Sequence, residues 1–141
     1  MGMTFHIDIV SAAKKLYSGR AELLVATAAQ GELGIISGHA QLLTSLKPGQ
    51  IRLRIPNQAE QEIFYISGGI LEVQPHLVTV LADEAERATD LDQAKALEAE
   101  KQARALLADK QGEADYAVAL KELAIAIAQL RAIRAVKKLT N

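Results

Sequence analysis

Glycine and proline are distributed so unevenly along this chain that they divide it into two parts. All three prolines and eight of the nine glycines lie in residues 1–88, and only Gly112 lies beyond them. Both residue types interrupt regular secondary structure, so a change in their frequency marks a change in architecture. The sequence therefore predicts two domains, residues 1–88 and residues 89–141.

The first part carries the pattern of short β-strands. Apolar and polar side chains alternate in TFHIDIV (residues 4–10) and in IRLRI (51–55), which is typical of strands with one buried face. The runs AELLVATA (21–28) and HLVTVLAD (76–83) are aliphatic and β-branched. Turns or bulges are indicated at residues 56–59, 67–69 and 74–76. These short strands predict an antiparallel sandwich or barrel over about residues 3–87.

The segment Gly31–Arg54 is an unusual part of this domain. It holds four glycines and one proline among many aliphatic residues. It is too rich in glycine for a helix and too apolar for an ordinary exposed loop. The string SGGILEV (67–73) superficially resembles a phosphate-binding loop, but a strand rather than a helix follows it, so a bulge or a close backbone approach is favoured.

Residues 89–141 predict two helices that form an antiparallel αα-hairpin. The first begins with Thr89 or Asp90 as its N-cap, and Gly112 separates it from the second. The first helix is expected to bury one face, made of Ala96, Ala99, Ala103 and Leu106. The second is expected to present an apolar seam of Tyr116, Leu120, Leu123, Ile127 and Leu130.

The alanine-rich face has an energetic consequence. Burial contributes about 0.8 kcal/mol for each CH₂-sized group, so an alanine methyl adds little to packing. Helix propensity, by contrast, is high throughout because Ala, Leu, Lys, Glu and Gln dominate. We therefore expect helices that persist while their packing is weak, so that the helical hairpin can open without melting. The predicted fold class is α+β.

Several classes of function lack support in the sequence. With 16 basic and 17 acidic residues the net charge is -1, which gives no reason to expect nucleic-acid binding. There are no cysteines, and the three histidines, His6, His39 and His76, are too far apart in sequence to suggest a metal site. No nucleophile elbow or P-loop is present. We predict no catalytic residue, no metal and no cofactor.

The end of the chain is basic. From Leu123 onward the charged side chains are Arg131, Arg134, Lys137 and Lys138, with no acidic residue among them. Their spacing places Arg131, Arg134 and Lys138 on one side of a helix. Cations suit the C-terminus of any helix, and that reading stays open beside the alternative of docking on an acidic protein surface.

Four strings of the sequence together resemble one known family. They are GELGIISGHAQLLTSLKPGQIRL (residues 31–53), YISGGILEVQPHLVTVLAD (65–83), LDQAKAL (91–97) and ELAIAIAQLR (122–131). In this order and along its whole length, the chain is similar to the epsilon subunits of bacterial F-type ATP synthases, particularly those of proteobacteria.

The resemblance implies a ten-stranded β-sandwich followed by the αα-hairpin, in a non-catalytic subunit of a rotary, proton-transporting complex. It implies binding to the gamma subunit and the c-subunit ring at the foot of the central stalk. It also implies a second state, in which the helical hairpin extends towards the alpha and beta subunits and inhibits ATP hydrolysis. The expected location is the cytoplasmic face of the bacterial inner membrane, as a peripheral protein held there by the complex.

The resemblance also assigns roles to individual residues. By position, Glu32 and His39 would contact the c ring, although Gly31–Gly38 could instead be turn chemistry with buried Leu33 and Ile35. Residues that would meet the catalytic head in the extended state are Arg131, Arg134, Lys137 and Lys138.

The ATP-binding motif of the family is only partly present in this chain. Members that bind ATP on the folded helical hairpin carry an acidic residue followed three positions later by arginine, and further arginines on both helices. This chain has Asp92 but Lys95, and the later positions match Gln102, Ile125 and Gln129. Lysine cannot reproduce the guanidinium fork on a phosphate, so we expect weak or absent ATP binding.

Two other functions remain open from the residues alone. A free-standing adaptor could use the sandwich for one partner and the helical hairpin for another, and it would not co-purify with alpha, beta and gamma subunits. A small enzyme with a cofactor in the sandwich would need convergent polar groups that the sequence does not show.

Overall fold

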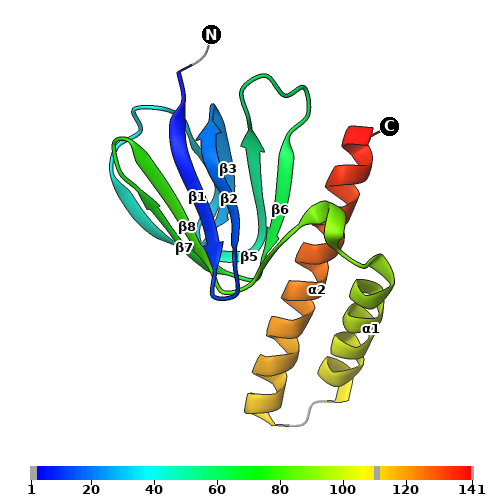
Figure 1. The fold of residues 1–141 in the computed structure, drawn as a ribbon. Helices are drawn as coiled ribbons and strands as arrows, with labels where there is room; N and C mark the ends of the chain where they lie inside the picture. The colour runs from blue at the N-terminus through cyan, green and yellow to red at the C-terminus, as the bar shows by residue number, and fades with distance from the viewer. Residues whose placement is uncertain (1–2, 110–111, 141) are drawn as a thin grey trace.

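The computed structural model describes residues 3–109 and 112–140 of the chain. A β-sandwich forms the N-terminal part, and two antiparallel helices form the C-terminal part (Figure 1). The predicted α+β class, a sandwich followed by a helical hairpin, is confirmed. Residues 1, 2, 110, 111 and 141 of the two predicted domains lie outside the described residues.

The sandwich is one mixed sheet of nine strands, in the order β2-β1-β8-β7-β5-β3-β4, with β6 paired to β5 and β9 paired to β6. The strands are β1 Phe5–Ser11, β2 Lys15–Ala21, β3 Leu23–Ala28, β4 Gly31–Ile35, β5 Leu42–Arg54, β6 Glu62–Ile66, β7 Gly69–Val73, β8 Leu77–Ala82 and β9 Ala85–Arg87.

Two details differ from the expected sandwich. Nine strands occur among the described residues instead of about ten, and β1 pairs with β8 in parallel, with His6 opposite Leu77. All the other pairs are antiparallel, as predicted. The exception has a topological reason: β1 and β8 are far apart in sequence, so no tight turn fixes their relative direction.

β5 explains the glycine-rich, aliphatic segment. Its first half pairs with β7 from Leu42 to Leu46, and its second half pairs with β6 from Gly49 to Leu53. At Gly49 a Cβ atom would lie 2.5 Å from the side chain of Thr27, so only glycine fits this close approach. The segment is apolar because β5 contributes to the core along most of its length.

The SGG string forms the predicted close approach of two backbones. Gly69 has φ 148°, and a Cβ atom there would lie 2.2 Å from the carbonyl oxygen of Leu81. β7 follows directly, so the string does not open a helix that could bind phosphate.

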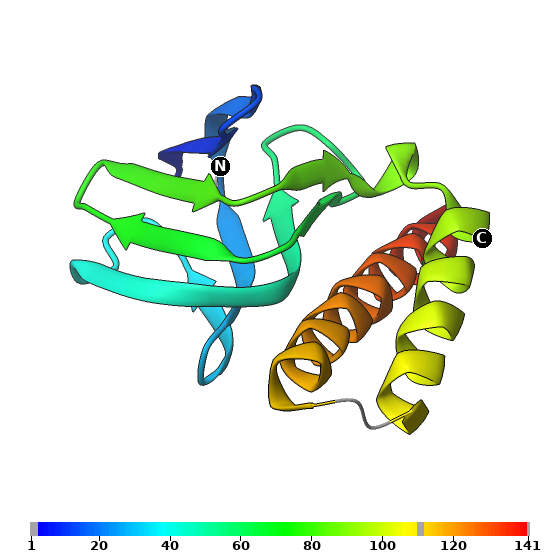
Figure 2. The ribbon, with the colours of Figure 1, turned by 90° about the horizontal axis from the view of Figure 1, so that it is seen from below.

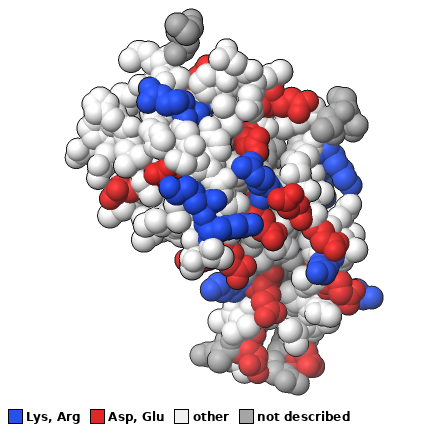
Figure 3. Space-filling view, in the orientation of Figure 1, with Lys and Arg blue, Asp and Glu red and all other residues white. Residues whose placement is uncertain are grey.

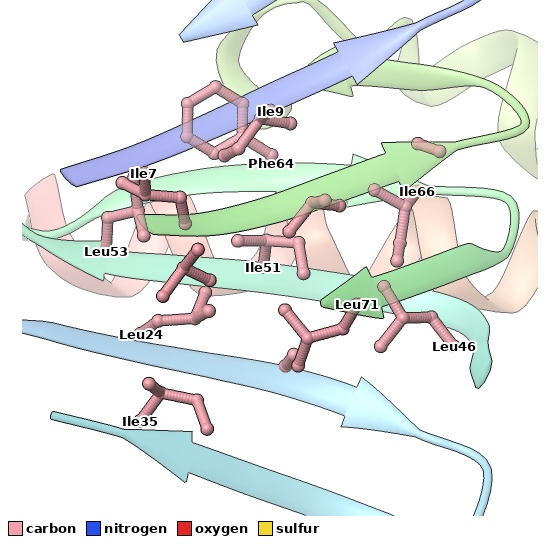
Figure 4. Packing of buried hydrophobic residues seen from close by; sticks show 14 of the residues in the cluster. Ile7, Ile9, Leu24, Ile35, Leu46, Ile51, Leu53, Phe64, Ile66 and Leu71 are labelled. Atoms are coloured by element: carbon pink, nitrogen blue, oxygen red, sulfur yellow. The ribbon is translucent and has the colours of Figure 1, made fainter. Parts of the chain in front are cut away.

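The core of the sandwich is almost entirely aliphatic and follows the alternation in the sequence. Ile7 and Ile9 point inward from β1, and Ile51 and Leu53 point inward from β5 (Figure 4). Phe5 of β1 is buried in the same cluster. Other fully buried members include Leu24, Ile35, Phe64, Ile66, Leu71 and Val80. This core lies within the β-strands, so the helices attach to its outside.

The C-terminal part consists of η1 Ala88–Asp90, α1 Gln93–Asp109 and α2 Glu113–Thr140. The predicted N-cap at Thr89 or Asp90 is wrong, because these residues form the short 3-10 turn η1. Asp92 occupies the capping position, and its Oδ1 accepts a hydrogen bond from the Lys95 amide at 3.2 Å. Gly112, with φ 71°, precedes α2, as predicted.

The helices pack mainly through alanine. α2 lies between the sandwich and α1 (Figure 2). The buried residues of the two helices are Ala96, Ala103, Ala119, Ala126, Ala128, Ala132 and Ile133. Alanine suits these positions because a helix that packs closely on another helix, or on the sandwich as at Ala128 and Ala132, leaves room only for small side chains along the contact line.

The predicted helix faces need correction for the same reason. Ala99 and Leu106 are exposed on α1, and Tyr116 and Leu120 are exposed on α2. Leu123, Ile127 and Leu130 are half-buried beside the alanine contacts. Within residues 3–109 and 112–140, no helix combines the length and apolarity needed to cross a bilayer.

Candidate partner-binding surfaces

Glu32 lies near the start of β4, and its side chain is 65% exposed. Nη2 of Arg52, on β5, donates to both carboxylate oxygens of Glu32 at 3.3 Å. β3 runs between these two strands, with Thr27 opposite Glu32. An exposed pair of this kind contributes about 0–1 kcal/mol, so Glu32 can exchange Arg52 for another cation at little cost.

His39 lies in the loop between β4 and β5. Its amide donates to the Ile36 carbonyl at 3.2 Å, and its Nδ1 lies 2.7 Å from the Ala40 carbonyl oxygen. Gly38, with φ 84°, allows this tight turn. The structure does not bring Glu32 and His39 together, because they lie towards opposite ends of β4. Ile35 is fully buried between them, and Leu33 is half-buried.

Large apolar side chains are exposed on the neighbouring strands. Leu43 on β5 is 69% exposed, and Ile70 on β7 lies opposite Leu81 on β8. We name Leu43, Ile70 and Leu81 the outer apolar patch. The sequence reasoning missed Ile70 and Leu81, because both lie in nearly continuous apolar runs that conceal which face each residue takes.

The basic end of α2 borders α1. Arg131, Arg134 and Lys137 line a groove of about 400 Å³ between the two helices, opposite Glu100 and Arg104 of α1. Lys138 is exposed and is not among the lining residues. Nζ of Lys137 donates to Oε1 of Gln93 at 2.8 Å. Of the ion pairs in the described part of the chain, none includes Arg131 or Arg134.

The positions that match the family's ATP motif do not converge. Asp92 caps α1, and the side-chain amide of Gln102 donates to Glu98 on the same helix at 3.3 Å. Ile125 packs against the sandwich, and Gln129 lines a cavity beside Tyr65. These side chains supply no grouped cations for a triphosphate.

The first two strands hold a group of three polar side chains that the sequence reasoning missed. Oγ of Ser18 donates to Oδ1 of Asp8 at 2.6 Å, and Nε2 of His6 lies 3.1 Å from the same oxygen and 3.2 Å from Ser18. The hydrogen bond from Ser18, foremost, lowers the pKa of Asp8. Asp8 and Ser18 both contact Nε2 of His6. A hydrolytic triad needs its acid and its nucleophile on opposite ring nitrogens, so this group is not such a triad.

Strands β5 and β6 both lie against α2, and β6 carries the buried apolar part of the contact between the sandwich and the helical hairpin. Ile63 and Tyr65 of β6 pack against Ala128 and Ala132 of α2, and we name these four residues the docking contact. Ala88 joins them from η1, and half-buried members around them are Leu91, Ile125, Ala135, Val136 and Leu139. A helical hairpin packed in this way is called docked below.

Arg87 fixes the chain immediately before the hairpin begins. Its guanidinium pairs with Glu62, donates to the Leu16 carbonyl at 2.9 Å, and lies over the Phe64 ring at 5.2 Å. These contacts hold β9 to β2 and β6, so a movement of the helices would begin after Arg87.

Basic and acidic side chains are interspersed over the face seen in Figure 3, so that face carries no extended surface of one sign. Among the described residues, no three His, Asp or Glu side chains are grouped closely enough to hold a metal ion. The surfaces that stand out as candidates for contact with other proteins are the β4–β5 region with the outer apolar patch, and the helical hairpin.

A family model and a curated relative point to the same family. The family model of the ATP synthase delta/epsilon chain β-sandwich domain matches residues 4–88. A curated ATP synthase epsilon chain from Nitrosococcus oceani is 53% identical over 138 residues, which cover 98% of each chain.

Two solved structures contain chains of similar fold. One belongs to the mitochondrial ATP synthase of Euglena gracilis, with a TM-score of 0.80 and 20% identity over 95% of this chain and 81% of that chain. The other belongs to the central stalk and c ring of the Tetrahymena thermophila mitochondrial ATP synthase, with a TM-score of 0.63 and 14% identity over 94% of this chain and 98% of that chain. At such identities the likeness concerns the fold alone.

Proposed function

This chain belongs to the ATP synthase epsilon chain family, and from that premise we propose that its sandwich joins the central stalk to the c ring while its helical hairpin restrains ATP hydrolysis. As a member of this family it is a non-catalytic subunit of the complex. Its partners in the proposal are the gamma subunit and the c-subunit ring, and also the alpha and beta subunits when the helices extend. The complex holds it at the cytoplasmic face of the bacterial inner membrane.

The proposed ring contact uses the β4–β5 region. Glu32 is exposed, and Arg52 is its ion-pair partner among the described residues, so a basic side chain of a c-subunit loop can replace that partner. His39 and the exposed Ile36 lie in the following loop and add polar and apolar contact area. The outer apolar patch is suited to gamma, because an exposed apolar surface is stabilised when a partner covers it.

The proposed regulation rests on one observation: α2 is held to both of its neighbours largely by alanine. Ala128 and Ala132 face the sandwich, and Ala126 lies buried in the helical hairpin. Converting nearly all docked molecules to the extended state takes about 5.5 kcal/mol of differential binding. A small, alanine-rich contact keeps this change within reach of a protein partner.

In the proposed extended state, Arg131, Arg134, Lys137 and Lys138 meet acidic residues of the catalytic beta subunits. Neither Arg131 nor Arg134 belongs to an ion pair of the described residues in the docked state, so their charges can bind elsewhere without breaking such a pair. Opposite charges at such an interface would resist rotation in the hydrolysis direction. We propose no cofactor for this chain, and weak or absent ATP binding.

A truncation tests this function. A chain that ends at Asp90 keeps the Arg87 contacts but lacks both helices. Complexes reconstituted with it should hydrolyse ATP faster than complexes with the full chain, while ATP-driven proton pumping stays coupled. Unchanged hydrolysis, with coupling intact, would remove the regulatory part of the proposal.

A further inference from the structure

The docking contact contains one polar atom that the fold leaves without a partner. Tyr65 is 2% exposed, and its hydroxyl is buried with no hydrogen-bond partner among the described residues. The side chain of Gln129 on α2 approaches this hydroxyl, and its hydrogen-bonding influence acts to lower the pKa of Tyr65, but the two side chains do not reach hydrogen-bond geometry. The other members of the docking contact are the apolar Ile63, Ala128 and Ala132.

The position of Tyr65 makes α2 responsible for this burial. Phe64 and Ile66 point into the sandwich core, and so Ile63 and Tyr65 point outward from β6 towards α2. When α2 leaves, the hydroxyl meets water and can form its hydrogen bonds. The cost of burying it therefore falls on the docked state alone.

Solvent borders the contact on one side. A cavity of about 520 Å³ is lined by Tyr65 and Gln129, by residues of the β1–β2 turn, and by the segment 83–86. The cavity does not expose the hydroxyl, which stays covered, but it leaves the edge of the contact incompletely packed. Water can therefore reach the hydroxyl once α2 moves away from this edge.

We propose that the buried Tyr65 hydroxyl is a release element, which holds the docked hairpin close to its opening point and so sets how readily partners can extend it. The release element rests on the proposed function for its biological role, but the opening of the isolated chain tests it independently. Replacing tyrosine by phenylalanine removes the buried oxygen and keeps the ring. Docking should therefore become tighter, although the variant only loses a polar group.

Thiol labelling measures the opening directly, because the chain has no other cysteine. Ala132→Cys places the probe on the face of α2 that packs against β6, at a position that is 0% exposed, and Ala26→Cys places one in the sandwich core, also 0% exposed. A thiol that reacts only in the open state reports the open population by its rate. Ala132→Cys should react faster than Ala26→Cys, because the helices open without global unfolding.

The decisive comparison adds Tyr65→Phe to the Ala132→Cys chain. Labelling should slow at least about fivefold, the change expected when a buried unpaired hydroxyl is removed. Tyr17→Phe is the matched control: the Tyr17 hydroxyl donates to the Arg20 carbonyl at 3.0 Å within β2, so its loss should not slow labelling. An unchanged or faster rate with Tyr65→Phe overturns the release element, as does equal labelling of Ala132→Cys and Ala26→Cys.

The complex then separates the two proposals. Tyr65→Phe in a reconstituted ATP synthase should raise ATP hydrolysis, since more of its hairpins stay docked. Slower labelling with unchanged hydrolysis overturns the proposed regulation and leaves the release element standing. Faster hydrolysis of the truncated complex together with an unchanged labelling rate overturns the release element alone.

Discussion

The side chains of Lys137 and Gln93 join the end of α2 to the start of α1, with Lys137 Nζ donating to Gln93 Oε1 at 2.8 Å. This bond closes the helical hairpin at the end opposite Gly112. Lys137 is also one of the cations proposed to meet the catalytic head. Extension of α2 away from α1 would therefore break this bond, and Lys137 could donate to a partner protein in place of Gln93.

Gln93→Ala should weaken docking only slightly. The bond is exposed, and a hydrogen bond to a charged group at the surface contributes on the order of 1 kcal/mol. Thiol labelling of Ala132→Cys should accelerate by less than about tenfold. Gln102→Ala is the control, because the partner of Gln102 among the described residues is Glu98 on its own helix, so the rate should be unchanged. A larger acceleration would mean that this one bond, and not the alanine contacts, holds the hairpin.

Gly69→Ala should severely destabilise the sandwich. The added methyl would lie 2.2 Å from the Leu81 carbonyl oxygen, at a φ of 148° that disfavours any side chain. We expect a loss of about 3 kcal/mol or more in the free energy of unfolding, measured by urea denaturation. Gly34→Ala is the control, since nothing lies within 4 Å of its Cβ and its effect should stay within about 1 kcal/mol. Equal losses in both variants would contradict the close approach at Gly69.

Much of the fold follows from local patterns in the sequence. Alternation placed Ile7, Ile9 and Leu53 in the core, and the glycines at 68 and 69 indicated the β6–β7 connection. The parallel pairing of β1 with β8 could not be predicted in this way, because no turn between them records it. The helix faces were also predicted incorrectly, since the largest residues of a helix mark its contact line only where the partner helix leaves room for them.

The candidate sites were predictable only where a charged residue stands out from its surroundings. Arg131 and Arg134 follow a long stretch without charges, and the structure places both beside α1. Tyr65, by contrast, looked like any strand residue, because its burial depends on two residues of α2, Ala128 and Ala132, that lie more than 60 positions later in the chain. The outer apolar patch and the group formed by His6, Asp8 and Ser18 likewise depend on pairing between strands.

The ionisation of Tyr65 should report the docked state. Burial, foremost, and the nearby Glu84 raise the pKa of Tyr65 to about 12 from its ordinary value of 10.0. The neutral hydroxyl is therefore favoured when docked, so docking is unaffected below pH 10 and weakens as the pH rises from about 10 towards 12. The absorbance titration at 295 nm, after subtraction of the Tyr65→Phe titration, should show one step near pH 12. A step near pH 10 would show that α2 does not cover Tyr65 in solution.

ATP should bind the isolated chain weakly or not at all. Asp92 is used to cap α1, and Gln102, Ile125 and Gln129 provide no positive charge where triphosphate recognition needs several. Titration calorimetry with ATP should give no measurable heat at micromolar concentrations of ligand. Lys95→Arg with Gln129→Arg serves as the comparison, and it should not bind more tightly than the natural chain, because Gln129 lines the cavity beside Tyr65 while Lys95 lies at the start of α1. Micromolar affinity of the natural chain would contradict this expectation.

Reversing the charge of Arg131 and Arg134 should relieve inhibition in the complex. Arg131→Glu with Arg134→Glu would turn two proposed attractions to the beta subunits into repulsions, weakening the extended state by roughly 2 kcal/mol or more. Hydrolysis should rise towards that of the complex truncated at Asp90. Docking itself should change little, because both side chains are exposed and belong to none of the ion pairs among the described residues.

Lys121→Glu tests whether net charge alone is responsible, since Lys121 is an exposed cation on the same helix outside the groove lined by α1. If Lys121→Glu relieved inhibition as strongly as Arg131→Glu with Arg134→Glu, inhibition would depend on net charge alone. The assignment of these two arginines to the contact would then be wrong.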